Sequence, residues 1–449
     1  MRCKVSTFFS KIWLFDGVFV ILSLKPIILL LNPMNCRHII LIAALFASIT
    51  AKADEPKDSL KTPKATVDTL KTDTVDKNKP VFTTIMELPI TSIKDQNRSG
   101  TCWDYSALSF FESELLRTKK KEYDLSEVFV ANKNYMDRAI LKVRMHGDAQ
   151  FAQGGSAYDV LYVLKNYGIC PEEAMAKPGA MVGDTLNNFN EFFDVMTPYV
   201  DAVSTSKGKK LTPAWKAGLQ GILDAYLGKT PENFTYEGKT YTPQTFAKSL
   251  GLNWDDYYNF TSYTHHPFYT EFPLEIQDNW RQGMSWNVPM TELERIIDNA
   301  LEQGYTVLWG GDVSEDGFTR DGLAMLVDIE KVQSNEGSDM AKWLKLSSSE
   351  KKEKLQKLGV NVPELTPSQE KRQEEYDNWQ LTDDHGMHIY GKATDQNGRI
   401  YYKVKNSWGK HGDYDGIWYM SKNFIIAKAM DIMVNKHAVP KEILNKLKK

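Results

Sequence analysis

The sequence predicts an α+β fold, because helical patterns in the first part of the chain are followed by a hairpin pattern. Between residues 102 and 117, apolar side chains from Tyr105 to Leu115 recur on one helical face. A second amphipathic helix follows the glycine pair that opens "GGSAYDVLYVLKNYG" at residues 154–168. In the last third, two apolar runs flank residues 395–398, and Asn-Gly between such runs is typical of a β-hairpin.

Length and composition are compatible with one large globular domain that carries insertions. The chain has 449 residues, of which 42% are hydrophobic and 12% are aromatic. Its formal net charge of −3 gives no sign of the clustered basic face that nucleic-acid binding requires. We therefore expect small molecules, peptides or protein surfaces as partners, and no nucleic acid.

Residues 1–53 have the layout of an N-terminal extension followed by a leader for export. From Met34, a short basic start leads into an apolar run and a small-residue triplet, which predicts a signal peptide cleaved before Asp54. Residues 1–33 then lie upstream of the true start. Alternatively, Val18–Leu31 forms part of an uncleaved membrane anchor. We predict a periplasmic or extracellular protein with no stable membrane association after cleavage.

The remainder divides into a linker and one folded domain. Residues 54–80 are rich in Lys, Asp and Thr and have almost no large apolar side chains, which predicts a disordered linker. The domain spans residues 81–449, and the mixed segments at about 181–279 and 314–379 are interpreted as insertions. Within the domain, "GYTVLWGGDV" predicts a buried strand, and "TPSQEKRQEEYDNW" predicts a capped, solvated helix. We find no internal repeats.

Cysteine is scarce, and one cysteine lies at a predicted helix start. Export would leave only Cys102 and Cys170, which excludes a disulfide scaffold. "TCWD" fits a capping box with Thr101 as N-cap and Asp104 at the third helical position. The helix dipole would lower the thiol pKa of Cys102, and since Asp104 opposes this, an ion pair with a histidine must dominate. The alternative is that Cys102 is a small buried hydrophobe.

The predicted hairpin brings a histidine close to an asparagine. If its loop has four residues, Thr394 faces Arg399, and Met387 then opposes Asn406. His385 lies two positions from Met387 on the same face. Such diagonal neighbours are about 7–8 Å apart, within the reach of their side chains.

Together these residues could form a catalytic site for acyl transfer. Such a site needs a thiolate, an imidazole, a group that orients the imidazole, and donors for the oxyanion. Cys102 and His385 supply the first two, and Gln96 can present its amide beside the backbone N–H of Cys102. Asn406 can accept a hydrogen bond from the imidazole, and Trp408 can cover that bond from water. Each residue alone has an ordinary structural role, but their joint occurrence favours a cysteine peptidase.

Several stretches carry a family resemblance over about residues 81–444. "QNRSGTCW", "LSEVFVANK", "QGGSAYDVL", "DDHGMHI" and "VKNSWG" together resemble the papain superfamily of cysteine peptidases. "HHPFY", "LEIQDNW", "WGGDVSEDGF" and "DDHGMHI" are similar to the branch that contains bleomycin hydrolase and aminopeptidase C. The resemblance implies a papain-like two-lobed fold, with a helical lobe, a β-barrel-like lobe and helical insertions between the catalytic Cys and His.

The resemblance also implies roles for individual residues. The branch has its catalytic histidine before a small residue and a methionine, which matches His385 and makes His388 a neighbouring strand position that points elsewhere. Gly154 and Gly155 resemble the glycine pair that lets substrate backbone approach the cleft, although a plain helix-entry turn is the alternative. Trp408 would lie at the substrate cleft as well.

One histidine pair stays outside this pattern. His265 and His266 could bind a metal, but no Cys or carboxylate spacing nearby completes a site. We therefore expect the pair to pack or to shape a subsite, with no metal and no cofactor.

The leading hypothesis is an aminopeptidase-like cysteine peptidase acting on oligopeptides. Relatives carry a longer C-terminal arm whose carboxylate holds the substrate's amine, whereas this chain closes with "HAVPKEILNKLKK". An endopeptidase or oligopeptidase with an open cleft is therefore the alternative, and a non-catalytic peptide-binding module on a peptidase scaffold is a further one. Relatives form hexamers, so a homo-oligomer is also a possible state.

Overall fold

The computed structural model describes residues 78–183, 186–208, 210–335 and 346–447. The predicted extension, signal peptide and start at Met34, and all but the last three residues of the predicted linker, lie outside these ranges. Within the described residues, no helix combines the length and the apolar character needed to cross a bilayer. The alternative anchor at Val18–Leu31 also lies outside them.

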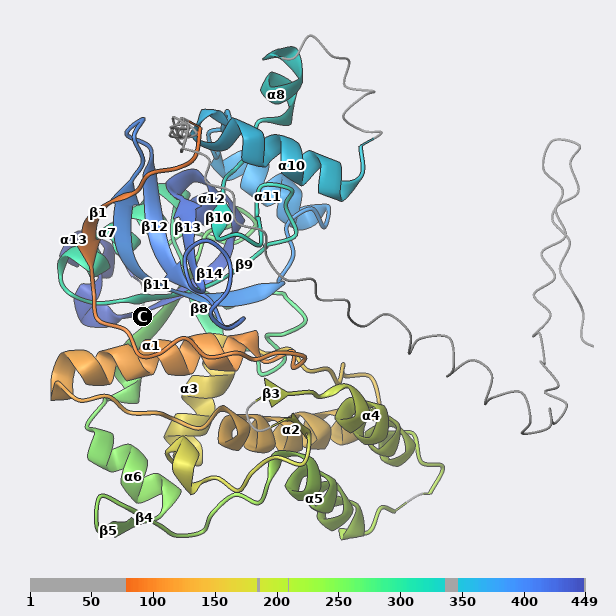
Figure 1. Ribbon diagram of the computed structural model, residues 1–449. Coiled ribbons are helices and arrows are strands. Elements are labelled where there is room, and N and C mark those ends of the chain that lie inside the picture. Colours follow the sequence, from red (N-terminus) through yellow and green to blue (C-terminus); the bar gives the residue numbers. More distant parts are fainter. Residues whose placement is uncertain (1–77, 184–185, 209, 336–345, 448–449) are drawn as a thin grey trace, which may run out of the picture. The chain divides into compact units, whose positions relative to one another are not determined.

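Helices make up most of the first half of the described chain and flank the sheet in the second half (Figure 1). The α-helices are α1 Cys102–Lys119, α2 Glu127–Arg144, α3 Ala157–Asn166, α4 Asn190–Ser204, α5 Ala214–Leu227, α6 Pro243–Leu250, α7 Met290–Glu302, α8 Ile329–Asn335, α10 Ser348–Leu358, α11 Gln369–Asp377, α12 Lys422–Lys428 and α13 Lys441–Leu444. Short 3-10 helices are η1 Glu172–Ala174, η2 Trp254–Asp256, η3 Gly359–Asn361 and η4 Lys436–Ala438.

The strands form one large mixed sheet and two small hairpins. They are β1 Thr83–Glu87, β2 Met181–Val182, β3 Leu186–Asn187, β4 Phe234–Tyr236, β5 Lys239–Tyr241, β6 Tyr257–Thr261, β7 Glu271–Pro273, β8 Met284–Asn287, β9 Val307–Gly311, β10 Leu323–Ala324, β11 His385–Thr394, β12 Ile400–Lys405, β13 Ile417–Ser421 and β14 Ala429–Asn435. The large sheet has the order β10-β13-β12-β11-β9-β14-β6-β8-β7, with β1 paired to β11. The buried strand predicted from "GYTVLWGGDV" is β9, near its centre.

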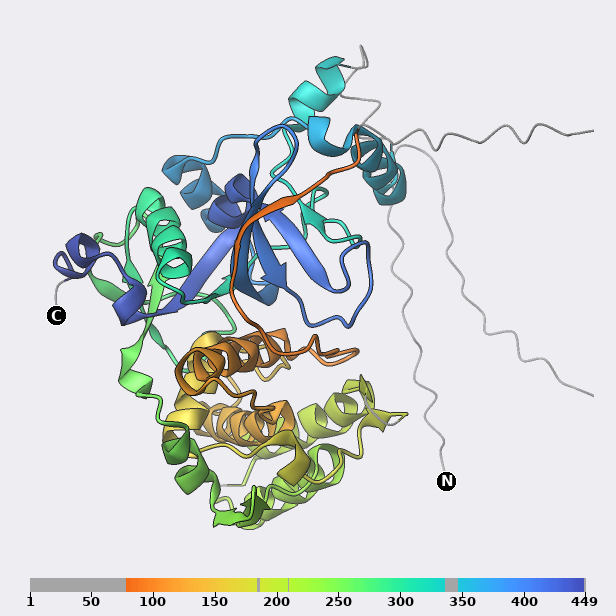
Figure 2. The same cartoon turned by 60° about the vertical axis from the view of Figure 1, so that its left-hand side comes forward.

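Helix α1 lies between the sheet and the helices α2 and α3 (Figures 1 and 2). It contacts β11 and β9 on one side and α2 and α3 on the other. Most of its length is therefore buried, including Phe110 and Phe111, which have no exposed surface. Truncating either phenylalanine to alanine would cost about 3–5 kcal/mol of stability. This packing holds the N-terminal end of α1, which carries Cys102, against the first residues of β11.

The start of α1 at Cys102 is confirmed, but the predicted capping box is wrong. Thr101 makes no side-chain cap bond, and its Oγ1 instead lies 2.6 Å from the Oγ of Ser99. Asp104 is fully buried, and neither carboxylate oxygen has a hydrogen-bond partner in the described structure. Burial raises the pKa of Asp104 well above its usual value, which favours the neutral carboxyl group.

The predicted hairpin is formed by β11 and β12, with one correction to its register. Thr394 pairs with Ile400 and not with Arg399, so the loop is one residue longer than predicted. A register irregularity in the middle of β11 then shifts the pairing by one residue, and Ile389 pairs with Val404 as the prediction requires. The two deviations cancel, and the pairing at the end that carries the histidines is the predicted one.

The longer loop is closed by the side chain of its first residue. The Oδ1 of Asp395 accepts hydrogen bonds from the backbone N–H groups of Asn397, at 2.8 Å, and Arg399, at 2.9 Å. An aspartate that bonds to backbone N–H groups further along the chain is a common turn device, and it accommodates the extra residue.

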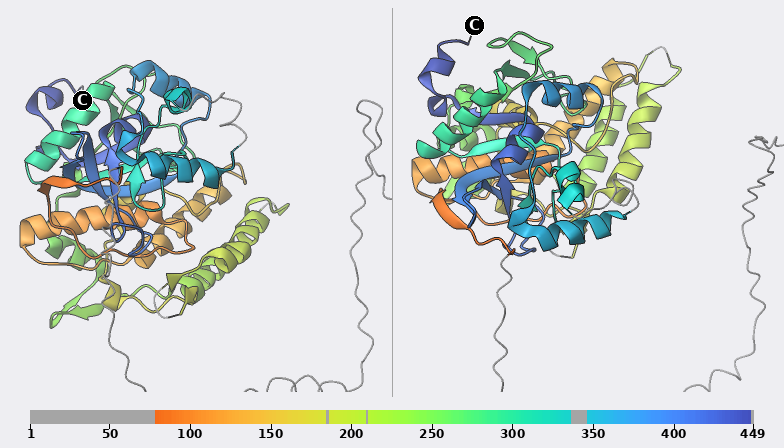
Figure 3. Two further views of the ribbon diagram at one scale, coloured as in Figure 1. Left: turned by 45° about the horizontal axis from the view of Figure 1, so that its top comes forward. Right: turned by 90° about the horizontal axis from the view of Figure 1, so that it is seen from above.

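The segment 181–279 combines peripheral helices with two strands of the large sheet. Helices α4 and α5 lie side by side and pack on α2 (Figure 3). Their shared core includes Phe192, Met196, Leu219 and Leu223, all without exposed surface. Further along, β6 and β7 join the large sheet, and the loops around β7 reach the site described below.

The segment 314–379 is largely helical where it is described. Its predicted helix at "TPSQEKRQEEYDNW" is α11, and the cap is confirmed, since Ser368 accepts a hydrogen bond from the N–H of Lys371. The predicted solvation is only partly right, because Arg372 is 2% exposed and donates to the backbone carbonyls of Ser262 and Ala427. This buried guanidinium joins α11 to the sheet.

Candidate active site

Cys102 lies where the first turn of α1 meets the first residues of β11. Its side chain lines a narrow cavity of about 40 Å³ together with Trp103, His385 and Gly386. The glycine permits this approach, because a Cβ at Gly386 would lie 2.6 Å from the Oγ of Ser106 and 3.3 Å from the carbonyl oxygen of Cys102. A small residue after the histidine is therefore a packing requirement.

His385 and Asn406 are brought together at the open end of the hairpin. The Nε2 of His385 lies 2.7 Å from the Oδ1 of Asn406, and both residues are buried. The backbone N–H of Ser407 donates to the same Oδ1, at 2.8 Å, which identifies this atom as the acceptor. Nε2 of the neutral imidazole therefore carries the proton, and Nδ1 is left as the basic nitrogen.

Trp408 covers this hydrogen bond. Its ring centroid is 4.8 Å from that of His385, with the two planes inclined at 36°. A tryptophan in this position keeps water away from the His385–Asn406 pair and so strengthens the bond between them.

His388 lies on the opposite face of β11, as the alternation of strand side chains requires. It has no exposed surface, and its Nδ1 is 2.9 Å from the Oγ of Ser109 on α1. Burial and the nearby ammonium of Lys405 lower its pKa well below the usual value. His388 is thus part of the packing between α1 and the sheet, remote from the cavity at Cys102.

Gln96 is fixed to the turn that follows β12. Its Oε1 accepts a hydrogen bond from the Oγ of Ser407 at 2.6 Å, and its Nε2 donates to the carbonyl oxygen of Ser99 at 2.7 Å. Its backbone N–H also donates to the carbonyl oxygen of Ser407. Gln96 is buried close to the turn formed by Asn406 and Ser407, although it is not among the described residues that line the narrow cavity. Its role toward an oxyanion stays a prediction.

Gly154 and Gly155 both lie where neighbouring side chains leave no room for a Cβ. A Cβ at Gly155 would lie 2.9 Å from the ring of Trp103, and a Cβ at Gly154 would lie 1.9 Å from a carboxylate oxygen of Asp278. Gly155 lines the narrow cavity, and Gly154 lines a wider cavity of about 700 Å³ beside it. The structure accounts for both glycines by these close approaches, and their contact with substrate stays a prediction.

Acidic side chains around the cavity were missed from the sequence. Asp278, Asp383, Asp384 and Asp431 all line the narrow cavity with Cys102. The signal was present, since Asp383 and Asp384 directly precede His385 and Asp278 belongs to "LEIQDNW". The site therefore places several carboxyl groups beside its thiol.

Burial dominates the protonation of Cys102 and His385. Burial raises the pKa of Cys102 to about 12, assisted by the charges of Asp383 and Asp278 and opposed by backbone hydrogen bonds from Gly386 and Trp103. Burial lowers the pKa of His385 to about 4, partly offset by its bond to Asn406. These shifts oppose the low thiol pKa predicted from the helix start, and they favour a thiol and a neutral imidazole in the unliganded site.

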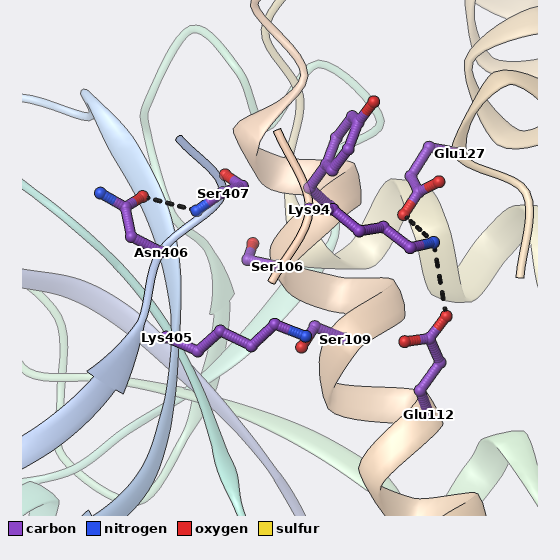
Figure 4. Close-up of a pocket in the computed structure, with 9 residues that line it drawn as sticks. Lys94, Ser106, Ser109, Glu112, Glu127, Lys405, Asn406 and Ser407 are labelled. Atoms are coloured by element: carbon purple, nitrogen blue, oxygen red, sulfur yellow. Dashed lines mark hydrogen bonds and ion pairs between the residues drawn. The ribbon is translucent and has the colours of Figure 1, made fainter. Parts of the chain in front are cut away.

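A largely buried cluster of charged side chains lies between α1, α2 and the end of β12 (Figure 4). Lys94 donates to Glu127, at 2.7 Å, and lies 3.6 Å from Glu112. Lys405 donates to the hydroxyl oxygen of Thr91, at 3.0 Å. Lys94 lies two residues before Gln96, and Lys405 directly precedes Asn406. These contacts therefore anchor the backbone segments that position Gln96 and Asn406.

The expectation for the histidine pair, His265 and His266, also requires a correction. His265 Nε2 lies 3.1 Å from one carboxylate oxygen of Glu275, and His266 Nε2 lies 2.8 Å from the other. The expectation that no carboxylate accompanies this pair is wrong, because the chain reverses at β7 and returns Glu275 to the loop that carries the histidines. Glu275 also lines the wider cavity.

Comparisons with known proteins agree with this geometry. The model of the Peptidase C1-like family matches residues 57–381 and 365–449. The chain is 22% identical over 399 residues to aminopeptidase G of Lactobacillus delbrueckii subsp. lactis, covering 81% of this chain and 84% of that protein. It is 24% identical over 408 residues to aminopeptidase C of the same organism, covering 81% and 83%.

A yeast protein and a solved structure extend the comparison. Cysteine proteinase 1, mitochondrial, of Saccharomyces cerevisiae is 21% identical over 425 residues, covering 82% of this chain and 79% of that protein. The crystal structure of PepW from Lactobacillus rhamnosus superposes with a TM-score of 0.60 at 19% identity, covering 81% and 84% of the two chains, which shows the shared papain-like fold. The chain therefore belongs to the Peptidase C1-like family and is a cysteine peptidase.

Proposed function

We propose that the protein hydrolyses oligopeptides through Cys102, His385 and Asn406, with a preference for substrates that have a free N-terminus. The observation that carries the proposal is the hydrogen bond between His385 Nε2 and Asn406 Oδ1, which leaves Nδ1 as the base in the cavity shared with Cys102. The aminopeptidases among the relatives support the preference for a free amine.

The reaction proceeds in two halves. His385 takes the proton of Cys102 as the sulfur attacks the scissile carbonyl carbon, and the developing oxyanion is stabilised by the backbone N–H of Cys102 and the amide of Gln96. The tetrahedral intermediate collapses to a thioester, and the imidazolium gives its proton to the departing amine. Water then attacks the thioester with His385 as base, which releases the acid and regenerates the thiol.

The wide cavity is the natural space for the substrate. It shares Ile276, Asp278 and Asp383 with the narrow cavity at Cys102, so a peptide bound there can present a carbonyl to the sulfur. Its volume of about 700 Å³ falls within the usual range of about 300–1,000 Å³ for ligand sites.

The acidic side chains would hold the substrate's ammonium group. Burial and the neighbouring carboxylates of Asp278 and Asp431 raise the pKa of Asp383 well above its usual value. A bound ammonium ion favours the charged carboxylate and would offset both effects. The arm carboxylate used by relatives would here be that of Lys449, which lies outside the described residues. Lys446, close to it, pairs with Glu292.

The test compares two reporters that differ only at the amine. An aminoacyl reporter with a free amine should be hydrolysed well over tenfold faster than its N-blocked form, because leaving the carboxylates without a partner cation costs several kcal/mol. Equal rates would replace the aminopeptidase proposal by the endopeptidase or oligopeptidase alternative. Hydrolysis of neither reporter, with retained peptide binding, would favour the non-catalytic module.

We also propose that the protein acts outside the cytoplasm. The support is the arrangement of basic start, apolar run and small-residue triplet between Met34 and Asp54. Cell fractionation followed by N-terminal sequencing should give a mature chain that begins at Asp54. A cytoplasmic protein that retains Met34 would contradict the proposal.

A homo-oligomer, as formed by relatives of this branch, is proposed on that resemblance. Light scattering coupled to size-exclusion chromatography should give a mass that is a multiple of that of one chain. A monomer at micromolar concentration would contradict it.

A further inference from the structure

Three donors from two loops converge beside the wide cavity. His265 and His266 lie between β6 and β7, and Glu275 lies just beyond β7. One ligand atom from each residue lies within 4.8 Å of the other two. The side chains of the histidines are 30% and 34% exposed, so the cluster is reachable from solvent while its backbone is fixed by the sheet.

The imidazole of His265 is held by a second layer of contacts from α11. Its Nδ1 lies 3.1 Å from the Nε2 and 3.3 Å from the Oε1 of Gln373. Gln373 is itself fixed, since its Oε1 accepts from the N–H of Thr264 and its Nε2 donates to Asp377. Binding the far nitrogen of a histidine in this way is the usual means by which a protein aims the other nitrogen at a metal.

Ring contacts and a backbone contact fix the rest of the cluster. The imidazole of His266 stacks on Phe272, with centroids 4.1 Å apart and planes inclined at 25°. The ring of Tyr376 stacks on His265, and its hydroxyl donates to the backbone carbonyl of Glu275 at 2.8 Å. Both imidazoles and the backbone of Glu275 are therefore held by contacts that do not involve the donor atoms.

We propose that His265, His266 and Glu275 bind a divalent transition-metal ion of the zinc class. Two imidazoles and one carboxylate form a donor set that catalytic zinc sites use, with the fourth position left for water or a ligand. At bond lengths of about 2.0–2.2 Å, tetrahedral ligands are roughly 3.3–3.5 Å apart. The observed nitrogen–oxygen distances of 3.1 and 2.8 Å, which involve different oxygens of Glu275, would have to widen by about 0.2–0.7 Å.

The place of the site gives the ion a means to act on the peptidase. Glu275 and the adjacent Ile276 both line the wide cavity, and Ile276 also lines the narrow cavity at Cys102. A bound dication would add positive charge next to the carboxylates of Asp278 and Asp383. This effect on substrate rests on the proposed function, whereas metal binding itself does not.

The test measures Zn²⁺ binding to the full chain by isothermal titration calorimetry, after removal of metal with a chelator. It uses the Cys102→Ala background, because the catalytic thiol and imidazole could themselves bind zinc. One equivalent of Zn²⁺ should bind, and His265→Ala, His266→Ala and Glu275→Gln should each weaken binding at least tenfold. Gln373→Ala, which removes a contact to His265 Nδ1 and none to the ligating Nε2, should weaken binding about 10–100-fold.

Matched controls separate this site from adventitious binding. His437→Ala removes an exposed histidine that also lies near a carboxylate, that of Asp256 at 3.6 Å, and should leave binding unchanged. Circular dichroism melts verify that each variant is folded. Absence of a saturable equivalent in the Cys102→Ala background, or equal losses in the His265 and His437 variants, would overturn the proposal. Either result would leave the peptidase assignment of Cys102 unaffected.

Discussion

The narrow cavity at Cys102 and the wide cavity beside it share three residues, yet they are built in different ways. The narrow cavity forms where the first turn of α1 meets the first residues of β11, and its reactive residues lie within short motifs. The wide cavity is bounded by segments near residues 150, 276 and 380, which no local pattern connects. Under the proposed function, the chemistry of this peptidase is specified locally, whereas its selectivity would depend on loops brought together by the whole fold.

Removing the catalytic groups of the narrow cavity should have the largest effect. Cys102→Ala should abolish hydrolysis, and His385→Ala should lower kcat by several orders of magnitude, as for the nucleophile and base of serine peptidases. His388→Asn is the matched variant, since it alters a histidine on the other face of β11 and should change kcat only modestly. Steady-state kinetics on the free-amine reporter measures all three. An essential His388 would contradict the assignment of His385 as the base.

The second-largest loss of activity is expected from removing the side-chain amide of Gln96. Gln96→Ala should lower kcat about 10²–10³-fold, the usual cost of losing one oxyanion donor, with little change in KM. Ser407→Ala removes the hydrogen bond to Gln96 but keeps the amide, and it should cost much less. Equal losses in the two variants would mean that Gln96 acts by fixing the turn and not by binding the oxyanion.

The acids at the junction of the two cavities should determine selectivity. Asp383→Asn and Asp278→Asn should each reduce the preference for the free-amine reporter more than tenfold, mainly through a higher KM. Asp377→Asn, which lines the wide cavity away from Cys102, is the control and should preserve the preference. A preference that survives in both Asp383 and Asp278 variants would place the ammonium elsewhere.

The protonation of the narrow cavity can be tested through pH. A thiol whose pKa is raised to about 12 is protonated at neutral pH, so its thiolate fraction rises about tenfold per pH unit. The alkylation rate of unliganded Cys102 by iodoacetamide should therefore rise about tenfold per unit between about pH 6 and 9. As pH falls through about 4, His385 becomes protonated and can no longer accept the proton, so kcat/KM should fall. An alkylation rate that is flat across neutral pH would show instead that an ion pair with His385 outweighs burial.

The same contrast explains which predictions from the sequence succeeded. The start of α1, strand β9, the cap of α11 and the pairing at the open end of the hairpin depend on neighbours in the chain, and all are confirmed. The failures depend on tertiary contacts. Asp104 is buried away from the cap that its spacing suggested, and Glu275 reaches the histidine pair only because β7 reverses the chain.

The thiol pKa of Cys102 also depends on tertiary contacts. A helix N-terminus lowers a thiol pKa by a moderate amount, but burial against β11 and the proximity of Asp383 outweigh it. Neither the depth of burial nor the carboxylate facing the thiol can be inferred from the spacing of a motif. Asp383 lies two residues before His385 in the sequence, and only its position in the cavity gives it a role.

The smallest effect is expected from the C-terminal end. Lys446 donates to Glu292 at 2.7 Å and to the hydroxyl oxygen of Tyr269 at 3.2 Å, and Leu447 packs on the core of the sheet. Deleting residues 446–449 should lower stability slightly, because a partly exposed ion pair contributes about 0.2–1 kcal/mol. The ratio of free-amine to blocked hydrolysis should stay within about twofold, since Asp278 and Asp383 are retained. A collapse of that ratio, with an unchanged melting temperature, would assign the ammonium to the carboxylate of Lys449 and would make selectivity, too, a property of one short terminal segment.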